Sequence, residues 1–230
     1  IATDSGGLFY DAAARALYAG SVRVDLVSGR ADDVWVHSPH GTREAPRGYV
    51  RDTQRGRLYA IAHNGIPGSN GGQILVPIDP ETAPYVASQV GVTDAVYDAP
   101  TDRLFTTSRR MAACALTAYS ARDGAEIIGL RLEGCPEHLA VASETGHLWV
   151  AVNPPPAAAS DPAGDPVAEG ALMVGLDPGT LHRVATIPVA ARVDSLAVDA
   201  ASGRVLAAMG ESGGIVVIQD VETPAPPALL

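Results

Sequence analysis

A short pattern that recurs along the whole chain constrains the fold more than any other feature of the sequence. Each copy has an apolar lead-in, an Asp (Ser143 in one copy), a polar turn and then an apolar pair. Apolar residues on both sides of a tight polar turn are typical of two antiparallel strands joined in a hairpin. The pattern therefore predicts five hairpins, in YDAAARALY (10–18), RDTQRGRLY (51–59), YDAPTDRLF (97–105), ASETGHLW (142–149) and VDAASGRVL (198–206).

A second turn follows each hairpin and in most copies begins with an Asp. A carboxylate at that position accepts hydrogen bonds from backbone N–H groups about two residues further along the chain. β-branched and aromatic residues follow at strand spacing. Each repeat therefore reads as four antiparallel strands in roughly 40–55 residues. The copies of this turn are VDLVSG (24–29), IDPET (78–82), YSARDG (119–124), LDPGT (176–180) and QDVET (219–223).

The repeats predict the architecture because a single four-stranded sheet cannot bury both of its apolar faces alone. Sheets that pack face to face around a central axis can do so, and that arrangement is a β-propeller. We therefore expect an all-β chain, a single β-propeller domain over 1–230 with four-stranded antiparallel blades. The repeats are 4–40, 41–90, 91–135, 136–191 and 192–223, with a tail at 224–230.

The number of blades in the complete ring stays open. The last repeat has three clear strands, and its tail PAPPALL is a poor fourth because proline donates no ladder hydrogen bond. The N-terminal residues IAT resemble the end of RVATIPV, so we expect Ile1–Thr3 to complete the last blade. The ring then has five blades, or residues are missing, or a partner chain fills a gap.

The repeats resemble those of YVTN-type, or surface-layer-type, β-propellers. Their consensus has a D-x-x-x-x-R-L-Y-V hairpin, a V-x-V-I-D-x-x-T strand and turn, and a V-V-A-T-I-P-V-G strand. The closest matches are IVVIQDVET (215–223) and VATIPVA (184–190), and the resemblance extends over essentially the whole chain. Propellers of this family usually have seven blades, whereas five repeats are visible here, so the resemblance leaves open both a five-bladed ring and a larger one. It implies an architecture rather than a function, since propellers host lyases, dehydrogenase subunits, binding proteins and scaffolds.

Composition excludes several classes of function. The formal net charge is −10, so we expect no basic patch and no nucleic-acid partner. All 16 residues counted as Lys or Arg are arginines, which excludes Schiff-base catalysis, covalently held pyridoxal and a P-loop. No apolar run approaches the roughly 18 residues of a transmembrane segment. The repeated Asp11, Asp52, Asp98 and Asp199 are expected to cap turns rather than bind calcium.

The two cysteines bear on the cellular compartment. We place Cys114 at the start of the third strand of repeat three and Cys135 at the end of its fourth strand, so that both lie at the same end of the blade. A disulfide there closes a loop of about 20 residues and is worth roughly 3 kcal/mol; two reduced, buried thiols are the alternative. A disulfide predicts a periplasmic, cell-surface or secreted protein. The start at Ile1 fits a mature protein without its signal peptide, or a trimmed chain.

Candidate binding residues lie where the copies of the repeat diverge. Loops between second and third strands lie at the same end of a propeller as the loops that link blades, and this end is the usual binding surface. It also collects two long loops rich in Gly, Pro, Asn and Asp, at 63–73 and 153–170, either of which is a partner-binding arm or a tolerated insertion. The polar candidates are His37, His40, Arg43, Arg47, His63, Asn64, Asp94, Arg109, Arg110, His138, Asn153, Asp194 and Glu211.

Two groups of these candidates suggest chemistry, each with a simpler alternative. His37 and His40 are either metal ligands or acid–base groups, or they belong to a solvated loop between blades. A metal site needs a third ligand, and the sequence leaves open whether His63 or His138 is near. Arg109 and Arg110 suit a carboxylate or a phosphate, or they neutralise an acidic surface, or they cover apolar surface.

From these observations we expect a non-catalytic, extracytoplasmic propeller that acts as a binding or scaffold module. Its expected partner is another protein subunit or a cell-surface component, with no cofactor, and any small-molecule ligand stays open. The alternative is a propeller enzyme or enzyme subunit, either a metal-assisted lyase or the non-catalytic subunit of a periplasmic quinone-type dehydrogenase.

Overall fold

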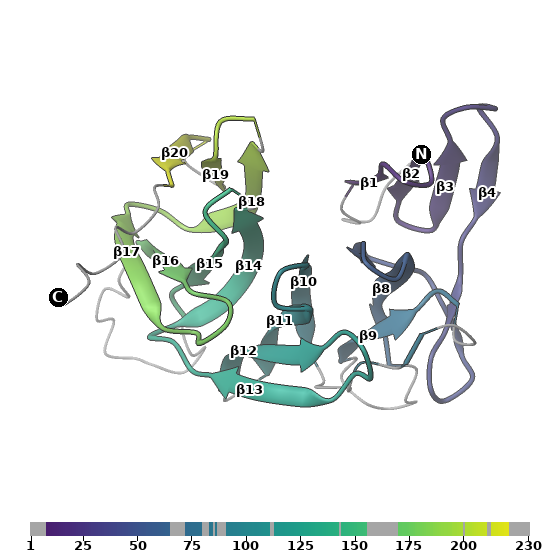
Figure 1. The fold of residues 1–230 in the computed structure, drawn as a ribbon, viewed down its shortest axis with the longest axis horizontal. Coiled ribbons are helices and arrows are strands. Elements are labelled where there is room, and N and C mark those ends of the chain that lie inside the picture. Colours follow the sequence, from purple (N-terminus) through teal and green to yellow (C-terminus); the bar gives the residue numbers. More distant parts are fainter. Residues whose placement is uncertain are drawn as a thin grey trace, which may run out of the picture. The chain divides into compact units, whose positions relative to one another are not determined.

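The computed structural model describes residues 8–64, 72–79, 83–84, 86, 91–110, 113–142, 144–155, 170–199, 201–210 and 213–220. All regular elements in these residues are β-strands, and they form successive antiparallel sheets (Figure 1). Nothing in this described part of the chain forms a helix that could cross a membrane. The prediction of an all-β fold of antiparallel propeller blades is confirmed. The chain divides into two compact parts, an N-terminal part (1–132) and a C-terminal part (133–230), and each is described by itself.

The N-terminal part contains blades one to three. Blade one has the order β1-β2-β3-β4, blade two has the described strands β7-β8-β9, and blade three has the order β10-β11-β12-β13. A two-stranded hairpin, β5–β6, lies between blades one and two in sequence, where we expected only a loop. The strands are β1 (Leu8–Asp11), β2 (Ala16–Ala19), β3 (Val22–Asp25), β4 (Ala31–Asp33), β5 (Val36–His37), β6 (Arg43–Glu44), β7 (Gly48–Asp52), β8 (Arg57–His63), β9 (Gln73–Pro77), β10 (Val92–Asp98), β11 (Arg103–Arg110), β12 (Ala113–Ser120) and β13 (Glu126–Leu130).

The C-terminal part contains blade four, in the order β14-β15-β16-β17, and blade five, with the described strands β18-β19-β20. The prediction that Ile1–Thr3 supplies a fourth strand for blade five concerns residues outside the described ones. The strands are β14 (Cys135–Ala142), β15 (His147–Asn153), β16 (Ala171–Leu176), β17 (Arg183–Val189), β18 (Val193–Asp199), β19 (Arg204–Met209) and β20 (Ile215–Gln219).

Strand alternation explains how neighbouring blades share their cores. Along β8, Tyr59 and Ile61 point to one side and pack with residues of blade three, including Leu104. Ala60 and Ala62 point to the other side and pack with blade one and the β5–β6 hairpin. Because successive side chains of a strand face opposite sides, one apolar strand serves two interfaces. Blades four and five share a core in the same way, with Trp149, Met173 and Val205 among its members.

The repeated aspartates cap turns, as predicted. Asp11 Oδ1 accepts from the backbone N–H groups of Ala13 (3.1 Å) and Ala14 (3.2 Å). Asp52, Asp98 and Asp199 accept equivalent bonds from residues two or three positions further on. These carboxylates therefore have a structural role in forming the hairpins.

Candidate binding site

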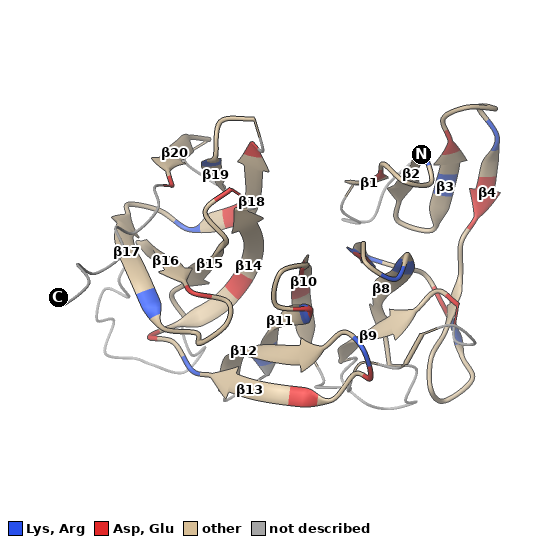
Figure 2. Cartoon of the chain, viewed as in Figure 1, with Lys and Arg blue, Asp and Glu red and all other residues tan. Residues whose placement is uncertain are grey.

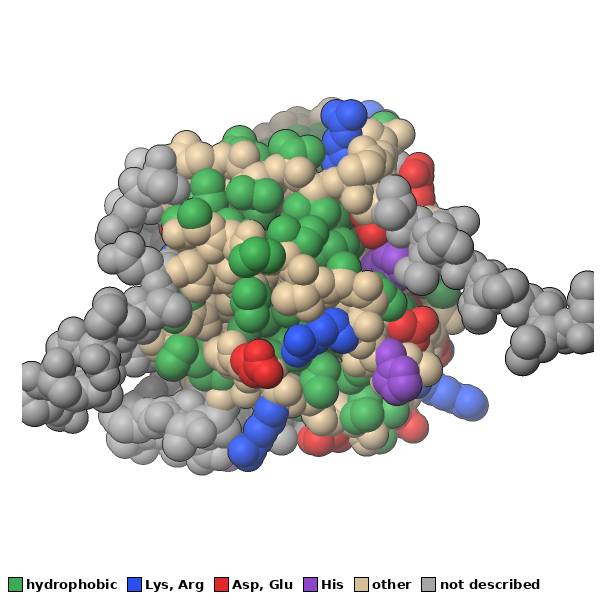
Figure 3. Space-filling view, turned by 90° about the vertical axis from the view of Figure 1, so that its left-hand side faces the viewer, with side chains coloured by type: hydrophobic (Ala, Val, Ile, Leu, Met, Phe, Trp, Pro, Cys, Tyr) green, Lys and Arg blue, Asp and Glu red, His purple; other side chains and the backbone are tan. Residues whose placement is uncertain are grey.

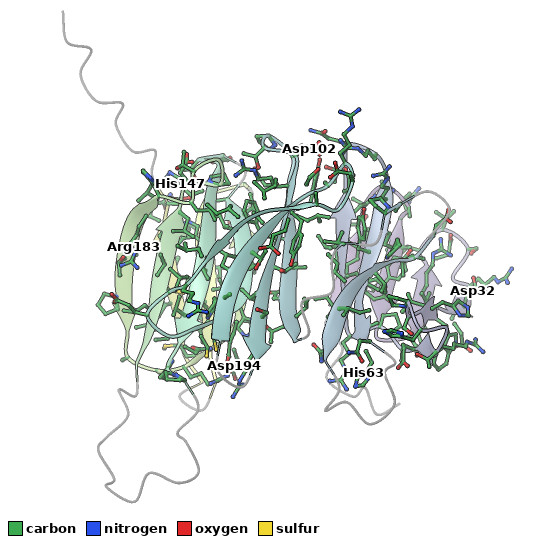
Figure 4. All side chains as sticks on the ribbon, turned by 90° about the horizontal axis from the view of Figure 1, so that it is seen from below. Asp32, His63, Asp102, His147, Arg183 and Asp194 are labelled. Atoms are coloured by element: carbon green, nitrogen blue, oxygen red, sulfur yellow. The ribbon has the colours of Figure 1, made fainter. Side chains whose placement is uncertain are left out.

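Each part of the chain has two ends. The turn end carries the capped Asp turns, and the loop end lies at the opposite ends of the strands (Figure 4). In the N-terminal part, Asp102 is at the turn end and His63 at the loop end. In the C-terminal part, His147 is at the turn end and Asp194 at the loop end. Two of the residues predicted for binding, His63 and Asp194, thus lie at loop ends, so these ends are where a site is to be sought.

At the loop end of the C-terminal part, Asn153 fastens blade five to blade four. Asn153 ends β15 and is fully buried. Its Nδ2 donates to the Val193 carbonyl (2.8 Å), and its Oδ1 accepts from Val193 N (2.9 Å). The same Nδ2 also donates to Glu137 Oε2 (2.9 Å). The amide of Asn153 is thus used within the fold rather than presented to a ligand.

Glu137 and Arg192 complete this contact, and neither was singled out from the sequence. Glu137 lies near the start of β14 and is only 4% exposed. Its Oε2 accepts from the guanidinium of Arg192, which lies just before β18. The Arg192 side chain is 43% exposed, and its Nε lies 3.8 Å from Asp194 Oδ1. Breaking the ion pair between Glu137 and Arg192 is costly, because the carboxylate charge would stay buried without the guanidinium.

His138 and Asp194 flank this cluster, with His138 half-buried and Asp194 exposed. Burial lowers the pKa of His138, and the charge of Arg192 acts in the same direction, whereas Glu137 and Asp194 oppose it. The imidazole is therefore mostly neutral at pH 7 and can both donate and accept hydrogen bonds. A Cβ at Gly210 would lie 2.2 Å from Asp194 Oδ2, so a glycine leaves room for that carboxylate. This arrangement can recognise polar groups.

At the loop end of the N-terminal part, the β5–β6 hairpin has a well-ordered turn. Ser38 is 3% exposed, and its Oγ lies 2.7 Å from Thr42 Oγ1. The Ser38 amide donates to Thr42 O (2.9 Å), and the Gly41 amide donates to Ser38 O (2.9 Å). A dense network of local bonds holds the hairpin in one conformation.

The two sides of this hairpin differ. Val36 is 1% exposed and packs with blades one and two. Trp35, His37 and Arg43 are exposed, and the Arg43 guanidinium lies over the indole, 4.5 Å from its centroid. His37 and Arg43 are cross-strand partners. Sequence reasoning found His37 and Arg43 but missed Trp35, although the alternation in VWVH was the available signal.

The other described candidates lie on several elements of the N-terminal part. Arg47 Nη1 lies 2.9 Å from the side-chain oxygen of Gln73, when that amide is turned so that its NH2 donates to Val92 O. His63 is the cross-strand partner of Gln73, and Asn64 is 3% exposed. His40 is exposed in the hairpin turn, Asp94 accepts from Ala95 N (2.8 Å), and Arg109 and Arg110 end β11. Glu211 lies outside the described residues, as does most of the loops at 63–73 and 153–170.

The structure brings no metal-ligand set together in the part of the chain that it describes. No group of three or more His, Cys, Asp or Glu side chains there is placed to hold a metal ion. The hypothesis that His37 and His40 belong to a metal site therefore has no third ligand among these residues.

Both cysteines are disulfide-bonded, as predicted. Cys114 is the second residue of β12. The predicted position of Cys135 was wrong, because this residue begins β14 of blade four rather than ending β13. The Pro136 that follows looks like a strand break in the sequence, yet it is tolerated at a bulge, where the register shifts between Pro136 and His138.

Charged and hydrophobic residues both reach the surface. Acidic and basic residues are interspersed along the strands and turns (Figure 2). In the C-terminal part, hydrophobic side chains gather on the side of β17 and β20 (Figure 3). On these strands Ile215 is 67% exposed, Val217 55% and Val184 37%. Exposed apolar groups of this kind are typical of surfaces that contact other molecules.

Comparison with known proteins supports the fold and no more. No protein-family model and no curated protein matches the sequence. Among solved structures, the chain is similar to the gluconolactonase XC5397 from Xanthomonas campestris, with 16% identity and a TM-score of 0.61, over 87% of this chain and 67% of that one. A chain of a mitotic checkpoint complex has 12% identity and a TM-score of 0.59, over 96% of this chain and 64% of that one.

A third similar structure is the dihydro-heme d1 dehydrogenase NirN, with 12% identity and a TM-score of 0.55. The match covers 93% of this chain and 45% of that one. At such identities, proteins with unrelated activities share the fold without sharing a function. The chain therefore has the fold of a β-propeller, built of antiparallel blades that carry the capped Asp hairpin.

Proposed function

We propose that this chain is an extracytoplasmic β-propeller of YVTN-type repeats that acts as a protein-binding or scaffold module, without a catalytic centre of its own. One observation carries the proposal. At the loop end of the C-terminal part, Oε2 of Glu137 and the side-chain amide of Asn153 are occupied in fastening blade five to blade four. Among the described residues of this end, the exposed side chains of Asp194 and Arg192 are placed to contact a ligand, which suits recognition rather than catalysis.

The disulfide supports the proposed location. Cys114 and Cys135 are both oxidised, and structural disulfides persist in the periplasm, at the cell surface or in the medium. The proposed partner is another protein subunit or a cell-surface component. The exposed Ile215 and Val217 give additional apolar surface for such a contact.

The proposal is tested with the oxidised chain and an extracytoplasmic extract of its source cells. A photo-reactive side chain at Asp194 and another at exposed Arg131, as a control on the surface of the N-terminal part, would be compared by mass spectrometry of the cross-linked products. We expect one protein to be enriched at Asp194. A monomer that shifts to no larger species on a sizing column, and that cross-links to nothing, would contradict the proposal.

A second measurement separates binding from enzymatic activity. The chain would be assayed for hydrolysis of sugar lactones with added Mg²⁺, Ca²⁺ or Zn²⁺, because a gluconolactonase shares its fold. We expect no turnover above background. Metal-dependent turnover that follows the chain through purification would favour the enzyme alternative, as a hydrolase rather than a lyase, and overturn the non-catalytic part of the proposal.

A further inference from the structure

We propose that Trp35, His37 and Arg43, on the outer side of the β5–β6 hairpin, form a docking site for an acidic segment of a partner protein. This inference rests on the binding function proposed above, and gives it a surface and a partner chemistry. It starts from an exposed tryptophan beside an exposed arginine, on a hairpin whose opposite side is anchored in the core.

The hairpin is preorganised for binding. Val36 is buried against blades one and two, and Ser38 holds the turn through its bonds to Thr42 and Gly41. The positions of Trp35, His37 and Arg43 are therefore set before a partner arrives. A rigid site loses less conformational entropy on binding than a mobile loop, so more of the contact energy appears as affinity.

Arg43 is oriented to receive a carboxylate. Its guanidinium stacks over the indole of Trp35, 4.5 Å from the centroid, and stacking leaves the N–H groups in the guanidinium plane open. Among the described residues no carboxylate forms an ion pair with Arg43, whereas Arg30 is paired with Asp32 at 2.8 Å. A planar guanidinium binds a carboxylate through two parallel hydrogen bonds, which favours Asp or Glu as the incoming group.

Trp35 adds an apolar contact beside that charge. It is 38% exposed, although a tryptophan gains by burial. Tryptophan and arginine are the residues most enriched at the energetic centres of protein interfaces. Because Arg43 already covers part of the ring, the site fits a carboxylate with a neighbouring apolar side chain better than a neutral sugar that needs an open ring face.

The local charge is less unfavourable to an acidic partner than that of the rest of the chain. The segment 30–47, which holds all three site residues, contains three arginines and three carboxylates and is neutral, whereas the whole chain has a net charge of −10. An acidic segment is therefore repelled less here than by the chain as a whole, and Arg43 supplies the attraction. His37 and His40 are exposed beside Arg43 and offer hydrogen bonds to further carboxylates or to backbone carbonyls.

The test uses a soluble synthetic peptide that is rich in Glu and contains a single Phe. The readout is how far the bound peptide protects the fluorescence of Trp35 from quenching by acrylamide, which is neutral. The only other tryptophan, Trp149, is 2% exposed, so acrylamide reaches mainly Trp35. We expect the peptide to protect Trp35, and Arg43→Gln to weaken binding about tenfold, the size of a moderate interface residue. Arg30→Gln removes the same charge from an exposed position outside the hairpin and should leave the affinity within about twofold. Titration calorimetry with Trp35→Phe gives a readout that does not depend on fluorescence.

The outcomes are distinguishable. Equal losses in Arg43→Gln and Arg30→Gln would mean non-specific charge attraction and would overturn the docking site. Tighter binding of an oligouronate than of the peptide would also overturn it, in favour of an acidic polysaccharide. If the chain cross-links to a protein at Asp194 but Arg43→Gln changes neither that partner nor the peptide, the docking site fails while the binding function stands. If no partner is found by either route, the binding function fails as well.

Discussion

Blades two and three, and blades four and five, meet at the turn end through the same positions of the repeat but with different chemistry. In blade two, Arg57 Nη1 donates to the carbonyls of Ala121 (3.1 Å) and Arg122 (3.2 Å) in the second turn of blade three. The residue at the position of Arg57 in blade four is His147. Its Nδ1 lies 2.9 Å from Asp220 Oδ1, at the second turn of blade five.

The neighbouring residues differ in the same way. In blade two, Arg55 forms a bidentate pair with Asp102 of blade three, with both N–O distances at 2.6 Å, and also contacts Asp52 at 3.1 Å. In blade four, Thr145 donates instead to Asp220 of blade five. Arg57 and His147 both contact the second turn of the next blade, whereas Arg55 contacts its hairpin turn and Thr145 its second turn. The comparison teaches that the repeat brings the same positions to the blade interface, and single substitutions decide which group makes the contact and which turn it reaches.

The largest loss of stability is expected from a substitution at the interface between blades four and five. Asp220→Ala removes the partner of both Thr145 and His147 from a site where Asp220 is only 7% exposed. We expect the free energy of unfolding to fall by about 2 kcal/mol, the cost of leaving buried polar groups without their partner. Urea denaturation followed by circular dichroism measures it. Asp194→Ala is the matched control at the loop end and should change the value by less than about 0.5 kcal/mol; equal losses would mean that Asp220 is not a specific fastening.

A smaller effect is expected at blades two and three. Arg55→Ala removes the guanidinium shared by Asp52 and Asp102, but Asp52 keeps its bonds from the N–H groups of residues 54 and 55. We expect a loss of about 1–1.5 kcal/mol, with Arg55→Lys recovering only part of it, because an ammonium cannot form the bidentate pair. The same denaturation experiment applies, with Arg30→Ala as the exposed control. A loss larger than that of Asp220→Ala would reverse the comparison.

These contacts also show what could be predicted from the sequence. The turn caps were predictable because Asp11 and its counterparts bond to residues two or three positions away, within one repeat. The Glu137–Arg192 pair joins positions 55 residues apart, and only the packing of blade five on blade four brings them together. The stacking of Arg43 on Trp35 depends on the register of a hairpin that has no counterpart in the repeat. Local chemistry was therefore readable from the pattern, whereas contacts between blades and features unique to one loop were not.

The two parts of the chain should also respond to acid over different pH ranges. Burial lowers the pKa of His138 below its ordinary 6.5, so the unfolded chain binds a proton there at pH values where the folded chain does not. The stability of the C-terminal part should therefore fall as the pH drops below about 6.5. In the N-terminal part, the bond from Arg55 lowers the pKa of Asp102 below 3.8, so its contribution is fully present above that pH and is lost only in stronger acid.

Hydrogen exchange read by mass spectrometry resolves this difference, because it reports opening in each part separately. Between neutral pH and pH 5, protection corrected for intrinsic exchange rates should fall in β14 and β18 and stay constant in β10 and β11. His138→Gln should flatten the fall in the C-terminal part. An unchanged fall in that variant would assign the acid sensitivity to another group.

The smallest changes in the free energy of unfolding are expected when Arg57 and His147, which occupy the same position of the repeat, are each replaced by the other residue type. His147→Arg keeps a donor opposite Asp220 and makes its charge permanent, so the free energy of unfolding should change by less than about 0.5 kcal/mol. Arg57→His shortens the side chain, and its contacts with the carbonyls of Ala121 and Arg122 should be lost at a cost of about 1 kcal/mol. The two substitutions should therefore differ in their cost. The side chain of Asp220 can adjust to a longer partner, whereas the backbone carbonyls of blade three cannot shift toward a shorter one. Equal costs in the two variants, measured by the same denaturation experiment, would show that reach is not what distinguishes the two interfaces.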